Sequence, residues 1–186
     1  MLRKSRVRLL VFGAAAVAAL AVGIPLASGH ATLTLLFPVP GTQPLTAATD
    51  TWLLRVPNER YHRSTWKVVL HIPAVAQSSF TLRQHPGWKT TLTTQDTGAK
   101  DGNGDPVSVV TDVTWQALPG NNIGPGTAWY GEFQFRFKNP ATPGPVCFHV
   151  DQYYNGQTKG APVEVVSWAD GAGTAHPAPC VNVVSS

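Results

Sequence analysis

The sequence predicts an all-β domain, an immunoglobulin-like or cupredoxin-like β-sandwich of about nine strands. Apolar residues recur at every second position, Pro and Gly interrupt this pattern roughly every dozen residues, and no stretch sustains the period of 3.6 that a helix needs. The composition agrees, because 17 Gly and 16 Pro among 186 residues, with only 13% charged residues, suit a compact, turn-rich fold. This length favours one domain of ordinary size over a multidomain protein.

Two segments show the alternation most clearly. In 66–72 the apolar side chains alternate with Lys67 and His71, and in 133–137 three Phe alternate with polar residues. The other strands are expected at 32–37, 51–56, 88–94, 107–116, 147–154, 163–168 and 181–184. Turn residues connect several of them, notably Asn155-Gly156 and the Gly- and Asp-rich loop 98–106. This loop also resembles an acidic calcium loop, but it lacks the final Glu and the flanking helices of an EF-hand.

Residues 1–29 are predicted to form a secretory signal peptide. A basic start is followed by an apolar run at 9–23, a break at Pro25, and small residues at Ala27 and Gly29. Cleavage after Gly29 would leave a mature domain at 30–186 that begins with His30. The alternative is an uncleaved membrane anchor, but the apolar run is shorter than the ~20 residues a span requires. We therefore expect a secreted or extracytoplasmic protein with no membrane span after signal removal.

The net charge of +4 and the pI of 9.3 do not indicate a nucleic-acid partner. Four basic residues of the predicted signal peptide account for this whole excess, namely Arg3, Lys4, Arg6 and Arg8. A hydrolase is not indicated either, because the sequence has no Gly-x-Ser-x-Gly elbow and no paired-carboxylate motif.

Cys147 and Cys180 are the only cysteines. Export would place them where disulfides persist, so one bridge is expected, closing a loop of about 34 residues and stabilising the fold by roughly 3 to 4 kcal/mol. The alternative is a copper(I) site formed by Cys147 and His149, which would share one face of strand 147–154.

A histidine at the first position of a mature chain has special chemistry. The free α-amine and Nδ1 of His30 could close a six-membered ring around one metal ion. The amine has a reference pKa of ~7.7 to 8.0, so a metal can displace its proton near neutral pH. Nitrogen pairs of this kind prefer copper(II) among divalent first-row ions. His30 alone does not establish such a site, because it could lie near the cleavage point by chance.

Short motifs spread along the chain extend this interpretation. The most specific is Leu-Arg-Val-Pro-Asn-Glu-Arg at 54–60, in a β-rich exported chain that would start with His. It is followed in order by His-Pro-Gly-Trp at 85–88, Val-Thr-Trp at 113–115, Gln-Tyr-Tyr-Asn-Gly at 152–156, Ser-Trp at 167–168 and Pro-Ala-Pro at 177–179. In kind and order these motifs resemble the YcnI-like family of bacterial copper-binding domains, over residues 30 to about 179.

The resemblance implies a β-sandwich that binds Cu(II) in a mono-histidine brace. Carried onto this sequence, the brace consists of the amine and imidazole of His30 and the carboxylate of Glu59, with Trp168 close to the ion. Glu59 would follow the turn after strand 51–56 and neutralise part of the ion's charge. Trp168 would shield the ion and place a π face near it.

Each of these residues also has an ordinary structural interpretation. Glu59 could be a solvated turn residue paired with Arg60 or Arg63, and Trp168 could serve core packing. The remaining histidines are expected at the surface or satisfied by neighbours: His62, His71, His85, His149 and His176. His62 could be an extra ligand because of its spacing from Glu59, but it lies outside the motif.

The sequence also departs from the family pattern. Residues 31–35 are more apolar than expected, and 95–107 looks like an insertion. Many relatives carry a C-terminal membrane helix that this chain lacks, which favours a soluble carrier.

The resemblance therefore predicts a copper-sequestering protein or metallochaperone in copper homeostasis, and not an enzyme. A membrane copper importer or another copper-handling protein is the expected partner. One alternative is an oxidative enzyme of the monooxygenase type using the same brace, although those enzymes normally add a second histidine. Another is a metal-free carbohydrate-binding or adhesion sandwich whose six Trp form a platform.

Overall fold

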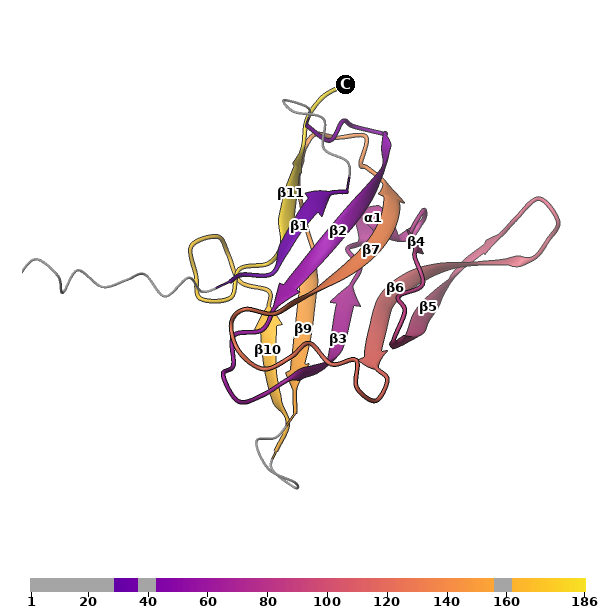
Figure 1. Cartoon of the computed structure of the whole chain (residues 1–186). Coiled ribbons are helices and arrows are strands. Elements are labelled where there is room, and N and C mark those ends of the chain that lie inside the picture. Colours follow the sequence, from indigo (N-terminus) through magenta and orange to yellow (C-terminus); the bar gives the residue numbers. More distant parts are fainter. Residues whose placement is uncertain (1–28, 37–42, 156–161) are drawn as a thin grey trace, which may run out of the picture.

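The structure is a computed structural model that describes residues 29–36, 43–155 and 162–186. The predicted signal peptide, apart from Gly29, and Gly156 of the predicted turn lie outside these residues. Two antiparallel sheets face each other and form a sandwich (Figure 1). The all-β prediction is therefore confirmed.

Each sheet combines strands that are distant in the sequence. The four-stranded sheet has the order β1 (Thr32–Leu35), β2 (Thr49–Pro57), β7 (Tyr130–Lys138) and β4 (Thr81–Leu82). The five-stranded sheet has the order β10 (Glu164–Trp168), β9 (His149–Tyr154), β3 (Thr65–His71), β6 (Pro106–Ala117) and β5 (Trp88–Lys100). A two-stranded ribbon joins β11 (Cys180–Val183) to β8 (Gly144–Cys147), and the one short helix of the described chain is α1 (Ala74–Gln77).

The core lies between the two sheets. Phe133, Phe135 and Phe137 of β7 are at most 1% exposed and point inward, as their alternation with polar residues predicts. Their rings meet aromatic side chains from other strands, with Trp115 4.7 Å from Phe133 and Phe148 5.3 Å from Phe135 between ring centroids. Burying each such side chain contributes about 1.5 to 3 kcal/mol, so this aromatic layer is a major source of cohesion.

Eleven strands are present in the described residues, compared with about nine predicted. The strand expected at 147–154 is in fact two strands, because the chain changes partners at Phe148. Before this residue β8 pairs with β11, and after it β9 pairs with β3 and β10. The N–H of Phe148 donates to the carbonyl of Pro179, at the point where the pairing switches. The other additions, β4 and α1, are only two and four residues long and too short for periodicity to reveal.

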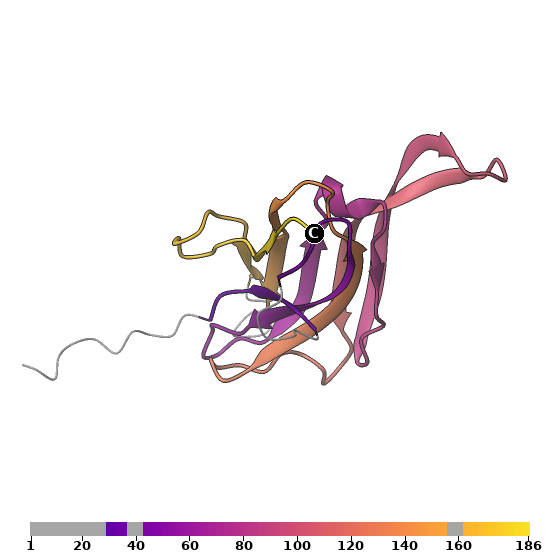
Figure 2. The same cartoon turned by 90° about the horizontal axis from the view of Figure 1, so that it is seen from above.

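The strands β5 and β6 are longer than predicted and form an arm that projects from the sandwich (Figures 1 and 2). The expected loop 98–106 shortens to 101–105, and the apparent insertion 95–107 is the outer part of this arm. At its tip the carboxylate of Asp101 accepts hydrogen bonds from the backbone N–H groups of Asn103 and Asp105. Asp101, the first acidic residue of the segment that resembles a calcium loop, therefore serves to stabilise the turn.

A disulfide joins Cys147 to Cys180, as predicted. These residues are directly paired between β8 and β11, with Cα atoms 4.0 Å apart. The alternative copper(I) site is wrong, because it needs Cys147 as a thiol. Within the described chain we find no helix of the length and apolarity that crossing a membrane demands.

Candidate functional site

The three predicted site residues come from three different segments. His30 lies two residues before β1, Glu59 lies two residues after β2, and Trp168 ends β10. The ring centroids of His30 and Trp168 lie 6.2 Å apart. Glu59 is near enough to His30 for the imidazole charge to act on its carboxyl group. The fold thus gathers all three residues at one corner.

A buried asparagine shapes the turn that presents Glu59. Asn58 is fully buried, and its Nδ2 donates to the carbonyls of Arg63 and Gly124, at 2.8 and 2.6 Å. Its Oδ1 accepts a 2.7 Å hydrogen bond from the N–H of Arg60. These three bonds fix the backbone on both sides of Glu59. The Asn of the Pro-Asn-Glu-Arg sequence therefore has a structural role, because it shapes the turn that holds Glu59.

The carboxylate of Glu59 is incompletely satisfied. Its Oε1 is covered from solvent and has no hydrogen-bond partner among the described residues. Burial raises the pKa of Glu59, and the positive charges of Arg60, His176 and His30 oppose this rise in that order. A buried acceptor without a partner is costly, so this oxygen is suited to receive a cation or a donor from outside the fold.

The alternative that Glu59 pairs with Arg60 or Arg63 is wrong. Both guanidinium groups instead bind Glu164 of β10, at 2.7 Å for Arg60 and 3.1 Å for Arg63. Arg60 also donates from Nε to the same carboxylate at 2.8 Å. Glu164 therefore binds both arginines that lie near Glu59 in the sequence. Neither arginine forms a direct ion pair with the Glu59 carboxylate.

Tyr154 lies next to this turn and stays protonated. The N–H of Glu59 donates to its hydroxyl oxygen at 3.3 Å. Burial raises the pKa of Tyr154 to about 12, so the hydroxyl carries no charge at neutral pH. It adds no negative charge to the corner.

Trp168 is held by a hydrogen-bond chain through the core. Its Nε1 donates to Oε1 of Gln152 at 3.0 Å, and both side chains are fully buried. The amide of Gln152 in turn donates to the carbonyl of Pro57 at 2.8 Å and to Oγ1 of Thr65 at 2.7 Å. Gln152 thus connects the indole to the end of β2, two residues before Glu59.

His176 belongs to the same corner, although the sequence indicated only a surface or satisfied histidine. Its ring lies 5.3 Å from the Trp168 ring in an edge-on arrangement, and its charge acts on Glu59. The carbonyl of His176 accepts hydrogen bonds from the N–H groups of Ala169 and Asp170, which folds the segment after β10 back onto the strand end. His62, in contrast, is exposed, and within the described part of the chain no hydrogen bond or ion pair joins it to the corner.

Comparison with known proteins agrees with this architecture. The family model described as "Domain of unknown function (DUF1775)" matches residues 38–183, a span that contains Glu59 and Trp168 but begins after His30. Among solved structures, an uncharacterized protein from Nocardia farcinica with an immunoglobulin-like fold is 24% identical, with 84% of this chain and 99% of that chain covered and a TM-score of 0.59. This likeness supports the predicted immunoglobulin-like sandwich.

A DUF4466 family protein from Parabacteroides merdae is much less similar, at 6% identity, with 74% of this chain and 42% of that chain covered and a TM-score of 0.31. No curated protein matches the chain. The family match, together with the fold it spans, shows that the chain belongs to the DUF1775 family, the YcnI-like domains.

Proposed function

We propose that this protein binds Cu(II) outside the cytoplasmic membrane, at the corner formed by His30, Glu59 and Trp168, and performs no catalysis. It would hold copper for a membrane copper importer or another copper-handling protein, or keep the ion from doing harm. The observation that carries the proposal is the covered Oε1 of Glu59, which has no hydrogen-bond partner in the described residues.

The charge balance around Glu59 favours a cation as the missing partner. Burial disfavours the ionised carboxylate, and the adjacent arginines are bound to Glu164. A bound metal ion would supply positive charge directly at the oxygen and lower the pKa of Glu59. The residues at this corner therefore fit a bound metal ion better than they fit a turn whose polar groups are all hydrogen-bonded within the protein.

The imidazole of His30 supplies a nitrogen donor on the same corner, near Trp168. Cleavage after Gly29 would add the α-amine as a second nitrogen on the same residue. Two nitrogens and a carboxylate oxygen are donors that copper(II) accepts in a tetragonal set. The proposal depends on this cleavage, since an amide nitrogen in the uncleaved chain is a poor ligand.

Trp168 would shape the site without binding the ion. Its hydrogen bond to the buried Gln152 fixes the plane of the indole. A rigid aromatic wall excludes water from one side of the ion and offers a π face to a cation. We expect this wall to slow loss of the ion more than it changes the choice of ion.

The test is a calorimetric titration of the secreted protein with Cu(II). We expect a tightest binding event of one ion per chain that is lost in His30→Ala and in a form carrying one extra residue before His30. His62→Ala is the matched control and should bind as the unmodified protein does. Equally tight binding by the extended form would refute the proposal.

One observation favours a second candidate, an oxygen-activating copper enzyme. Such enzymes use a second histidine, and His176 lies beside Trp168 at this corner. Ascorbate-driven oxygen consumption by the copper-loaded protein, with chitin or cellulose present, would distinguish an enzyme from a carrier. We expect no rate above that of the same amount of copper bound to a simple peptide chelator.

The carbohydrate platform has less support. Four of the six tryptophans are at most 9% exposed, namely Trp52, Trp88, Trp115 and Trp168. Buried indoles cannot stack on a sugar, so they serve the core instead.

A further inference from the structure

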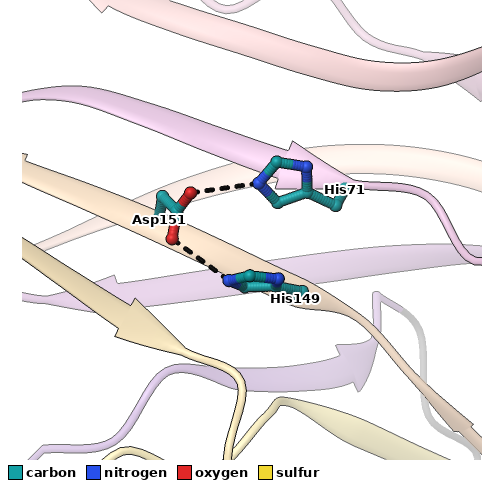
Figure 3. A group of neighbouring side chains, drawn as sticks. All are labelled: His71, His149 and Asp151. Carbon is teal, nitrogen blue, oxygen red and sulfur yellow. Dashed lines mark hydrogen bonds and ion pairs between the residues drawn. The ribbon is translucent and has the colours of Figure 1, made fainter.

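A second group of metal-ligating side chains lies on the outer face of the five-stranded sheet. We propose that His71, His149 and Asp151 form a separate site for a divalent transition ion, Zn(II) or Cu(II). Figure 3 shows the Asp151 carboxylate beside the two imidazole rings, with one oxygen directed to each ring. This inference goes beyond the proposed function, because it uses none of the residues at the Glu59 corner.

Strand register brings these residues together. His71 of β3 is directly paired with His149 of β9, and Asp151 lies two positions further along β9 on the same face. Their sequence neighbours Leu70 and Val150 are fully buried and point into the core, so the cluster faces outward. The pairing is therefore set by the same pleat that builds the sandwich.

The distances suit a shared ion. Asp151 Oδ2 lies 3.1 Å from His71 Nε2, and Asp151 Oδ1 lies 3.1 Å from His149 Nε2. One possible ligand atom from each residue falls within 4.8 Å of the other two. Two ligands on a tetrahedral zinc ion, each at ~2.0 to 2.1 Å, stand about 3.3 Å apart. Small side-chain rotations would bring both nitrogens and one oxygen onto a single ion.

His71 is already oriented as a ligand. Its Nδ1 lies 2.6 Å from Oδ1 of Asp112 on the neighbouring strand β6. The hydroxyl of Thr111 donates to the other oxygen of Asp112 at 2.8 Å and holds this carboxylate in place. A hydrogen bond from Nδ1–H to a carboxylate is the usual way in which a histidine ligand is oriented, and an ion that replaces the hydrogen bond between Nε2 and Asp151 would then bind Nε2. These contacts of His71 and Asp112 do not involve Asp151.

The carboxylate of Asp151 is ready to bind a cation. The hydroxyl of Ser167 donates a hydrogen bond to its Oδ1, which holds the carboxylate in place on the outer face of the sheet. Solvent can still reach the group, because 37% of the His71 side chain, 45% of His149 and 19% of Asp151 are exposed. An incoming ion therefore has a path, and water can complete its coordination.

The ligand set defines the class of ion. Two imidazoles and one carboxylate suit zinc with one open position, and they also bind copper(II), which ranks above zinc in general affinity. Calcium and magnesium prefer all-oxygen sites and are not expected here. Comparing Zn(II) with Cu(II) in the same protein would show which ion the site holds more tightly.

The experiment is equilibrium dialysis of the secreted protein against Zn(II), with metal analysis, repeated with Cu(II). We expect His149→Ala and Asp151→Asn each to abolish one binding event per chain. Asp112→Asn should keep the event but weaken it 10- to 100-fold, as loss of the outer hydrogen bond to a ligand typically does. His62→Ala, an exposed histidine outside the cluster, is the matched control and should change nothing.

Two comparisons keep the result interpretable. Circular dichroism and the thermal midpoint of each metal-free variant would show that these surface changes leave the fold intact. Extending the chain before His30 should remove only the event at the Glu59 corner, and His149→Ala only the event on the outer face. Identical stoichiometry and affinity in the unmodified protein, His149→Ala and Asp112→Asn would overturn the proposal, whatever happens at the N-terminus.

Discussion

Replacing Gln152 with Leu removes three hydrogen bonds without opening a large cavity. The fully buried amide accepts from Trp168 and donates to the carbonyl of Pro57 and the hydroxyl of Thr65. Leu has a similar volume, so the change tests the polar network more than the packing. Trp168 and Thr65 are fully buried, so water cannot readily replace their lost bonds, whereas Pro57 is only partly buried.

The expected loss follows from these contacts. A net contribution of about 1 kcal/mol for each hydrogen bond predicts that Gln152→Leu lowers the free energy of unfolding by about 3 kcal/mol. Thr65→Val removes only one of the three bonds and should cost about 1 kcal/mol. Gln116→Leu is the control, because Gln116 is exposed on β6, and such changes usually stay within about 0.5 kcal/mol.

Urea denaturation followed by circular dichroism would measure all three variants. Because Gln152 orients Trp168 and anchors the end of β2, we also expect Gln152→Leu to weaken Cu(II) binding, by about tenfold. A graded loss of stability in the order Gln152→Leu, Thr65→Val, Gln116→Leu supports the reasoning. If Gln152→Leu costs no more than Gln116→Leu, the network does not stabilise the corner and the reasoning is refuted.

Three further predictions concern other parts of the molecule. Changing Cys147 and Cys180 together to Ser should lower the free energy of unfolding by about 3 to 4 kcal/mol, measured by denaturation without reductant; an unchanged midpoint would show that the bridge is not stabilising. Because the pKa of Glu59 is raised, the fold favours its protonated form. In the metal-free protein, the stability contributed by protonated Glu59 should therefore be fully present below pH 4.5, the ordinary pKa of Glu. It should be lost as the pH rises through the raised pKa. Glu59→Gln should then be more stable than the unmodified metal-free protein at pH 7 but not at pH 4, and a pH-independent difference would contradict this sign. Replacing residues 97–107 by a two-residue turn should change the free energy of unfolding by less than about 1 kcal/mol, because the side chains of the arm's tip are largely exposed; a loss above about 2 kcal/mol would mean that the arm supports the sandwich.

Local patterns predicted most of the sheet. The alternation in 66–72 and 133–137 predicts which side chains face the core, and the structure buries Val68, Leu70 and the three Phe of β7 accordingly. The prediction fails at Trp66, which is only half-buried because a bulge between Thr65 and Lys67 shifts the register. The disulfide could be predicted because the sequence contains only two cysteines and its N-terminal pattern predicts export. These features depend on residue type and spacing alone, which one sequence contains.

The corner could be predicted only in part. The signal-peptide pattern predicted His30 as the first residue of the mature chain, and the family resemblance added Glu59 and Trp168. The motif at 152–156 contains Gln152 but gave no sign of its buried role, and no pattern pointed to His176. His176 reaches the corner because its own segment folds back onto the end of β10. Glu164 binds Arg60, which lies 104 positions earlier in the sequence, and no periodic pattern predicts this pairing. Pairings of this kind are decided by tertiary packing.

Strand β9 contributes to two polar clusters that lie close together but on opposite faces of the sheet. Gln152 points into the core and connects to Trp168, whereas Asp151 points outward and accepts a hydrogen bond from Ser167. Since consecutive side chains of a strand lie on opposite faces, the pairs 151–152 and 167–168 each serve both clusters. A slip of one residue between β9 and β10 would turn Asp151 into the core and Gln152 to solvent. The buried apolar side chains of these strands, Val150, Tyr154 and Val166, oppose such a slip and so keep the two clusters separate. Changes on the outer face should accordingly leave the His30 corner unaffected as long as this register holds.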